Sequence, residues 1–200
     1  QVLALIHKFK HIFTTDDAKL TPINVEVYEI PMLDYEPVSR QEYHTGPAER
    51  EKIQEFIDKF LEFGVIEPSN SAWRSPIFLR KKKDGKFRMI CDLRKVNAKI
   101  ASDCNTSIRP AVVLEKLSNM KYVSSLDLLS CYFQIPLSET SQQYMGFTFQ
   151  GRHYQYTRLV QGLKCSTSAT CKTFNRIFSD LLYQGQVINF IDDFLVPGRS

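Results

Sequence analysis

Three acidic residues stand out because each lies beside apolar, strand-like residues. Asp192 and Asp193 interrupt the apolar run 187–196, and Asp127 ends the run 122–127. Asp tolerates turn geometry and the flanking residues favour β-structure, so 187–196 predicts a tight hairpin with Asp192-Asp193 at its turn. Neighbouring carboxylates between buried strands repel each other, which indicates a cation nearby. Acids from two strands that meet at a sheet edge commonly hold the Mg²⁺ ions of phosphoryl transfer.

A second chemical feature is a basic segment that the modest net charge of +4 conceals. Residues 80–99 carry nine basic and two acidic side chains, a net charge of +7, which leaves about −3 on the other 180 residues. Charge concentrated in this way indicates a polyanionic partner. Asp84-Gly85 separates the β-like runs 77–83 and 86–92 and predicts a type I′ hairpin. The alternative is a solvated hairpin with a charged tip.

The elements that must position these residues follow from periodicity. Apolar residues at helical spacing predict a helix within 1–13, and the irregular residues 14–46 predict an extended strap. The clearest helix runs from Pro47 to Phe63, where Gly64 ends it. The other predicted elements are a short strand at 65–66, a helix at 111–120, strands at 121–127, 145–149 and 152–159, and a helix at 166–182.

Composition narrows the class of protein. A hydrophobic content of 43% with 24% charged residues is typical of one large or two small globular domains. No apolar run approaches the roughly 18–20 residues of a membrane span, and the N-terminal residues lack a signal peptide's basic leader, so we expect neither membrane association nor secretion. The five cysteines form no C-x-x-C pair, which favours reduced thiols. The mixed order of helices and strands predicts an α+β fold with helices on one face of an antiparallel sheet.

Several motifs, in this order along the chain, together resemble one family. LDLLSCYFQIPL, from Leu126 to Leu137, resembles the LDLxSGYxQIPL block of reverse transcriptases from gypsy-type LTR retrotransposons and retroviral Pol, and FIDD at 190–193 resembles their YxDD box. KKKDGKFR at 81–88 resembles their basic hairpin, and VQGLK at 160–164 resembles their PQGxK box. Val160 departs from the pattern, because proline is usual there. The resemblance covers about residues 47–196.

The resemblance implies the fingers and palm of a right-hand polymerase. The palm would be an antiparallel, ferredoxin-like sheet backed by helices, and the thumb would be absent. The implied domains are an N-terminal extension or strap at 1–39, fingers at 40–108, and a palm at 109–200. This palm would be truncated after the Asp-Asp hairpin, with fingers-like elements near 138–160.

The family's site residues carry over onto matching positions. Asp127, Asp192 and Asp193 would be catalytic. Asp127, Asp192 and the backbone carbonyl of Leu128 would hold two Mg²⁺ ions, for which Mn²⁺ can substitute. The implied nucleotide-binding residues are Lys82, Arg88, Ser130, Cys131, Tyr132 and Gln161, and the implied template-binding residues are Gly162 and Lys164. Tyr132 would exclude a ribose 2′-hydroxyl, although a core aromatic is the alternative for a tyrosine beside Phe133.

The implied function is an RNA-directed DNA polymerase of a retrotransposon Pol polyprotein, located inside the cell in cytoplasmic or nuclear element particles. Its partners would be dNTPs, an RNA or DNA template with primer, and the thumb and ribonuclease H portions of the same polyprotein. For residues 1–200 alone we expect salt-sensitive nucleic-acid binding without primer extension. The alternatives are a non-catalytic nucleic-acid-binding relic or domesticated domain on this fold, and an RNA-binding ferredoxin-like module. A pure binder needs the basic segment but not the three acids, which argues against the first alternative. The second would need exposed aromatic residues on its central strands, where this sequence has the acids.

Overall fold

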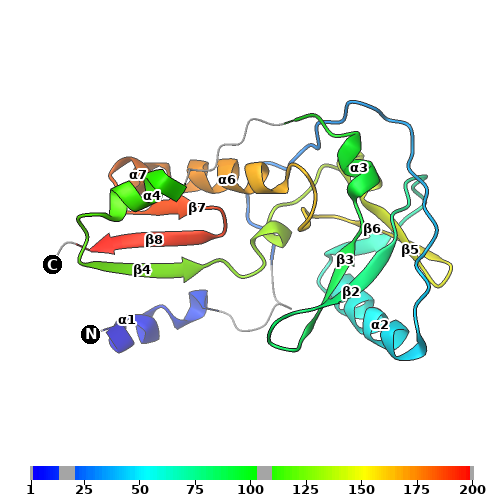
Figure 1. Cartoon of the computed structure of the whole chain (residues 1–200), viewed down its shortest axis with the longest axis horizontal. Coiled ribbons are helices and arrows are strands. Elements are labelled where there is room, and N and C mark those ends of the chain that lie inside the picture. Colours follow the sequence, from blue (N-terminus) through cyan, green and yellow to red (C-terminus); the bar gives the residue numbers. More distant parts are fainter. Residues whose placement is uncertain (1, 14–20, 103–109, 199–200) are drawn as a thin grey trace.

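The structure is a computed structural model that describes residues 2–13, 21–102 and 110–198. Figure 1 shows two parts side by side, one around strands β4, β7 and β8 and the other around α2 and the remaining strands. The strands form three separate sheets. The sequence patterns predicted an antiparallel sheet but did not show that the strands divide between three.

The first part is built on what we call the acid-bearing sheet. Its strands are β4 (Tyr122–Asp127), β7 (Ile188–Phe190) and β8 (Asp193–Gly198), in the antiparallel order β4-β8-β7. Helix α6 (Ser166–Ile177) covers one face, where Phe174 and Phe178 pack edge-on against Phe194 of β8. The short helices α4 (Pro110–Leu117) and α7 (Ser179–Tyr183) complete this part.

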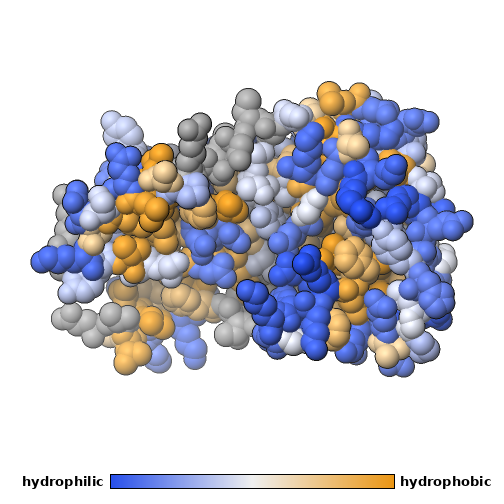
Figure 2. Space-filling view, in the orientation of Figure 1, coloured by the Kyte–Doolittle hydropathy of each residue, from blue (hydrophilic) through white to orange (hydrophobic). Residues whose placement is uncertain are grey.

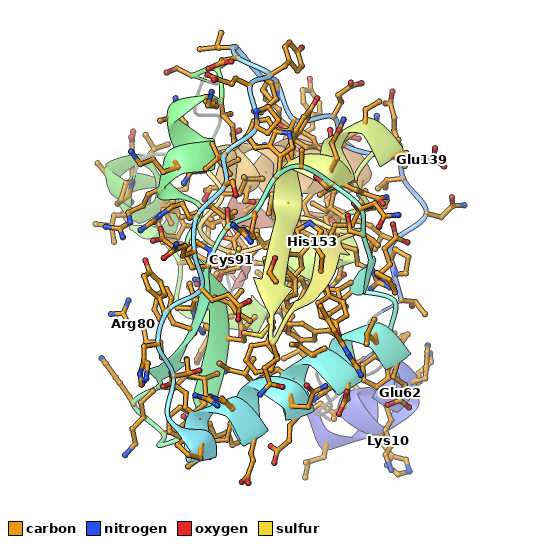
Figure 3. The ribbon with its side chains drawn as sticks, turned by 90° about the vertical axis from the view of Figure 1, so that its right-hand side faces the viewer. Lys10, Glu62, Arg80, Cys91, Glu139 and His153 are labelled. Carbon is orange, nitrogen blue, oxygen red and sulfur yellow. The ribbon has the colours of Figure 1, made fainter. Side chains whose placement is uncertain are left out.

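The second part contains the main hydrophobic core. Helix α2 (Pro47–Glu62) buries Ile53 and Ile57 completely, since they lie four residues apart on one face. One sheet has the order β1-β6-β5 and the other is the hairpin of β2 and β3. The bounds are β1 (Ile66–Pro68), β2 (Ile77–Lys81), β3 (Phe87–Cys91), β5 (Gly146–Phe149) and β6 (Arg152–Tyr156). Figure 3 shows Cys91 and His153 inside this part and Arg80 at its edge.

Short helical segments connect these elements, namely α1 (Val2–Lys8), η1 (Lys10–Ile12), α3 (Arg94–Ala98), η3 (Cys131–Gln134), α5 (Glu139–Gln142) and η4 (Gln143–Met145). Residues 21–46 form no helix or strand beyond isolated bridges, as the predicted strap requires, and residues 14–20 lie outside the described part. None of the helices in the described ranges combines the length and apolar character needed to cross a bilayer.

Most predicted elements are confirmed to within a few residues, but three details are wrong. The β2–β3 loop is not a type I′ turn, because Gly85 has a positive φ of 83° while Asp84 does not. The Gly85 amide instead bonds to the Lys82 carbonyl at 3.1 Å, which fits a type I turn followed by a left-handed glycine. The predicted helix 166–182 is interrupted at Phe178, which separates α6 from α7.

The third correction concerns the acidic hairpin. Phe190 pairs with Asp193, so the two turn residues are Ile191 and Asp192, and Asp193 is already the first residue of β8. The turn therefore lies one residue earlier than predicted. Ile191 takes a positive φ of 63°, which is rare for a β-branched residue.

Among the glycines that the structure describes, Gly146 lies closest to another backbone segment, so a substitution there tests the packing. A Cβ at Gly146 would lie 2.1 Å from the Trp73 carbonyl oxygen, whereas a Cβ at Gly46 would meet nothing within 4 Å. Gly146→Ala should therefore destabilise the chain by about 1–3 kcal/mol or more, as overpacking does. Gly46→Ala is the control for the added methyl group. Because Gly46 is the N-cap of α2, where glycine is preferred over alanine, it should cost no more than about 1 kcal/mol. Urea unfolding measures both, and equal stabilities would contradict this packing.

Candidate active site

The acid-bearing sheet brings the three predicted acids to one end. In the antiparallel register of β4 and β8, Asp127 stands directly opposite Asp193, and Asp192 precedes it in the turn. Side chains of directly opposed residues lie close together on one face, and like charges there are destabilising. Asp127 is exposed and the other two are half-buried, so solvent and ions reach them. The arrangement favours a bound cation.

The turn is tied to the first strand through the backbone. The Leu128 amide donates a hydrogen bond of 3.0 Å to the Asp192 carbonyl. This bond joins the residue after Asp127 to the turn that carries Asp192. It fixes the main chain at the place where the sequence predicted metal ligands.

A buried thiol lies behind the acids. Cys131 is buried, and this burial, followed by the charges of Asp192 and then Asp127, raises the pKa of its thiol to about 12. The thiol therefore stays protonated at neutral pH and is no nucleophile. Asp127 and Asp192 both lie within electrostatic range of this one sulfur.

Tyr132 bridges the two parts of the molecule. It packs against the main hydrophobic core and against a smaller buried cluster of Cys131, Phe174 and Phe194. Its hydroxyl bonds to the side chain of Thr167. Burial raises the pKa of the Tyr132 hydroxyl. The ring is only half-buried, so both predicted interpretations, sugar discrimination and core packing, remain compatible with its position. Its neighbour Ser130 has a left-handed backbone, with φ 46° and ψ 44°, and begins the turn into η3.

The basic hairpin contacts the loop that precedes α6. Arg88 on β3 donates a hydrogen bond to the side chain of Gln161, in the loop before α6. Two predicted nucleotide-binding residues that are 73 positions apart are thus in contact. Lys82 lies in the hairpin loop, and its side chain is exposed. Figure 2 shows hydrophilic residues gathered over this hairpin.

The loop with the predicted template-binding residues is held by one side chain. Asn97 on α3 donates to the Gly162 carbonyl and accepts from the Lys164 amide, each at 2.8 Å. The Lys164 ammonium donates to the Ile100 carbonyl at 2.8 Å. Gly162 has a positive φ of 96° and open space where a Cβ would lie. The sequence patterns did not show that Asn97 orders this loop.

Asp92 anchors the segment between β3 and α3. Its carboxylate is 6% exposed and accepts hydrogen bonds from Arg94, Arg40 and the Tyr43 hydroxyl, at 2.6–2.8 Å. The Arg94 guanidinium, followed in importance by Tyr43 and Arg40, holds the pKa of this carboxyl far below its usual range. Asp92 therefore stays charged and joins residues 40–43 to the segment between β3 and α3.

The donor set at the acids suits a hard cation. Carboxylate and carbonyl oxygens are the ligands that Mg²⁺ prefers. Within residues 2–13, 21–102 and 110–198, however, no three or more His, Cys, Asp or Glu side chains are grouped closely enough to hold a metal ion. The chemistry of the residues fits the metal, and its site stays a proposal.

Three residues near the acids were not predicted to contribute to the site. Asn189 and Asn175 are hydrogen-bonded at 3.0 Å between β7 and α6, and Cys171 of α6 accepts a hydrogen bond from the Ile191 amide. A signal for Asn189 was present in the sequence, because it is a polar residue inside an apolar run. Asn175 and Cys171 carry no such signal, since only the packing of α6 shows what they face.

Comparisons with known proteins show the family of this chain. A family model described as reverse transcriptase (RNA-dependent DNA polymerase) matches residues 80–200. The retrovirus-related Pol polyprotein from transposon 412 of Drosophila melanogaster is 30% identical over 206 residues, which cover all of this chain and 17% of the polyprotein. That from transposon gypsy of the same species is 29% identical over 202 residues, covering 96% of this chain and 19% of its own length.

A solved structure is similar throughout the fold. The foamy viral protease-reverse transcriptase in complex with dsDNA superposes with a TM-score of 0.81 at 27% identity, over 98% of this chain and 40% of that chain. The fold is thus the α+β fold of the fingers and palm of a right-hand polymerase. The chain belongs to the reverse transcriptase family, among the Pol polyproteins of retrotransposons and retroviruses. It spans about a fifth or less of the Pol relatives it matches.

The Asp92 cluster predicts how stability depends on pH. A carboxyl whose pKa is lowered by folding stabilises the fold above its unfolded pKa of about 3.9, and this contribution is lost as the pH falls further. Asp92→Asn should cost about 1–3 kcal/mol at neutral pH, because the buried carboxylate's charge-assisted hydrogen bonds with Arg40 and Arg94 are lost. The difference from wild type should shrink below about pH 4.

Urea unfolding at several pH values measures this difference, and Glu55→Gln, which alters an exposed carboxyl on α2, is the control. A cost for Asp92→Asn that stays constant down to about pH 2 would contradict the assignment.

Proposed function

We propose that this chain provides the polymerase site of an RNA-directed DNA polymerase, which adds dNTPs to a primer 3′-hydroxyl. The observation that carries the proposal is the β4–β8–β7 register, which gathers Asp127, Asp192 and Asp193 at one end of the palm sheet. A binding module has no use for three carboxylates that repel both one another and the phosphates of a nucleic acid.

Asp127, Asp192 and the carbonyl of Leu128 would hold two Mg²⁺ ions, with Asp193 close by and Mn²⁺ as a substitute. When bound, such ions lower the pKa of an attacking hydroxyl and neutralise the leaving pyrophosphate. The carboxylates position this charge, and the bond from the Leu128 amide to the Asp192 carbonyl keeps their two strands together.

The nucleotide would bind between the basic hairpin and the palm. Lys82 supplies a point charge and Arg88 a planar fork of donors for the triphosphate. The contact between Arg88 and Gln161 supports a shared pocket for these side chains. The amides of Ser130 and Cys131 would face the triphosphate, and Tyr132 would lie under the sugar.

A template with its primer would cross the loop that Asn97 holds. The open space at Gly162 would let a template backbone approach closely, and Lys164 would add charge beside it. The relative solved with dsDNA supports a nucleic-acid partner. We assign the strap to 1–39, the fingers to 40–108 and the palm to 109–200. The thumb and ribonuclease H portions would come from the same polyprotein.

The location would be inside the cell, in element particles. Cys91, Cys131 and Cys171 are free and buried, which supports a reducing compartment.

The carboxylates give the first test. Asp192→Asn in the complete polymerase should lower primer extension on the order of 1,000-fold or more, because the metals lose a charged ligand. Asp127→Asn should behave alike, while template–primer affinity survives in both. Extension assays with Mg²⁺ and an RNA template measure the loss. Near-normal extension by Asp192→Asn, or extension without a divalent cation, would favour the non-catalytic alternative.

Tyr132 gives the second test. Tyr132→Val should reduce discrimination against ribonucleotides by roughly 10-fold to 100-fold, because the ring that blocks the 2′-hydroxyl is gone. Deoxynucleotide incorporation should remain largely intact. Tyr132→Phe is the matched control, since it removes only the hydroxyl that bonds to Thr167. If Tyr132→Val leaves sugar discrimination unchanged, Tyr132 is a core residue.

A further inference from the structure

Asn189 is a buried amide in the middle of an apolar strand. It lies on β7, two residues before the turn, and is 4% exposed. Its amide nitrogen donates to Asn175, while its side-chain oxygen has no hydrogen-bond partner among the described residues. A buried polar atom left without a partner costs free energy, so an apolar side chain would serve stability better. The presence of a buried asparagine at position 189 therefore needs a reason other than stability.

One face of α6 meets the hairpin that carries Asp192. Cys171, Phe174, Asn175 and Phe178 recur at positions i, i+3, i+4 and i+7, which form a single stripe on a helix. The two aromatic rings pack against Phe194 with centroid distances of 5.8 and 4.9 Å. These apolar contacts attach the helix to the sheet but tolerate sliding, because they have little direction.

The two polar members of the stripe make directional contacts. Asn175 accepts the 3.0 Å hydrogen bond from Asn189, and the Cys171 sulfur accepts a hydrogen bond from the Ile191 amide. We call these two bonds the polar ladder. Its two steps reach β7 and the turn, one on each side of Phe190. Hydrogen bonds weaken steeply with distance and angle, so the ladder fixes where the hairpin lies along α6.

The turn needs such support. Ile191 is held at φ 63°, a left-handed conformation that is strained for a β-branched residue and persists only where its surroundings impose it. The Cys171 sulfur holds the amide of Ile191, and the Leu128 amide holds the carbonyl of Asp192. The two turn residues, Ile191 and Asp192, are therefore held by α6 on one side and by the end of β4 on the other.

We propose that Asn175, Asn189 and Cys171 are positioning residues, and that their polar ladder sets the place of the Asp192 carboxylate relative to Asp127. This inference rests on the proposed polymerase function. None of the three touches substrate, and each acts through the backbone of the hairpin. The ladder explains why the asparagines Asn175 and Asn189 lie at a place where two apolar side chains would also pack.

The first experiment separates position from stability. Asn175→Leu with Asn189→Leu removes both partners, a change that is close to neutral for stability. In the complete polymerase, the urea midpoint and template–primer affinity should stay unchanged. The Mg²⁺ concentration for half-maximal extension should rise by roughly tenfold, and hydrogen exchange of residues 187–193 should quicken by a similar factor.

Arg176→Leu is the matched control, because Arg176 is the exposed neighbour of Asn175 and its surface ion pair with Glu26 contributes little. It should change neither quantity.

The second experiment keeps the inference testable if the double variant fails to fold. Cys171→Ala removes the acceptor for the Ile191 amide, whereas Cys171→Ser retains an acceptor. Exchange at 187–193 should quicken with alanine and recover in part with serine. Unchanged exchange and an unchanged Mg²⁺ requirement in all these variants would overturn the ladder. If exchange changes as expected but the wild type extends no primer, the ladder stands and the proposed function is what fails.

Discussion

The antiparallel pairing of β4 with β8 is the constraint on which the site depends. It sets Asp127 opposite Asp193 and brings Asp192 against the end of β4. This gathering of like charge is unfavourable in itself. The three acids are held together by the packing of Phe174 and Phe178 on Phe194 and by the hydrogen bond from the Leu128 amide. These contacts offset the repulsion between the acids.

The second part of the molecule carries the cationic and polar groups that we assign to nucleotide and template binding. The β2–β3 hairpin carries most of the basic segment and reaches Gln161 through Arg88. Asp92 and Asn97 order the chain behind the hairpin, one as a buried carboxylate among arginines and the other as an amide that holds the Gly162–Lys164 loop. Both residues order the segments that carry the proposed nucleotide- and template-binding residues. Figure 1 shows the two parts side by side.

The hairpin turn shows how much strain the fold accepts at this point. A β-branched residue at positive φ precedes Asp192, and a buried amide lies two residues before the turn. Local rules of sequence disfavour both features, and such departures concentrate at functional sites. Gln150 also takes a positive φ, in a two-residue hairpin with Gly151, but unlike Ile191 it is not β-branched. The contrast supports a special role for the acidic turn.

The sequence by itself determined the element types, the three acids, the basic segment and the family, because alternation, glycine punctuation and linear motifs are local properties of a chain. It placed the acidic turn one residue late and took Asp84-Gly85 for a type I′ turn, since register is decided by partner strands. Only the tertiary structure decided that the strands divide into three sheets, that Asn97 holds a loop 65 residues away, and that Asn175 and Cys171 face the turn. These contacts join residues far apart in the chain, and their geometry depends on packing that no local pattern encodes.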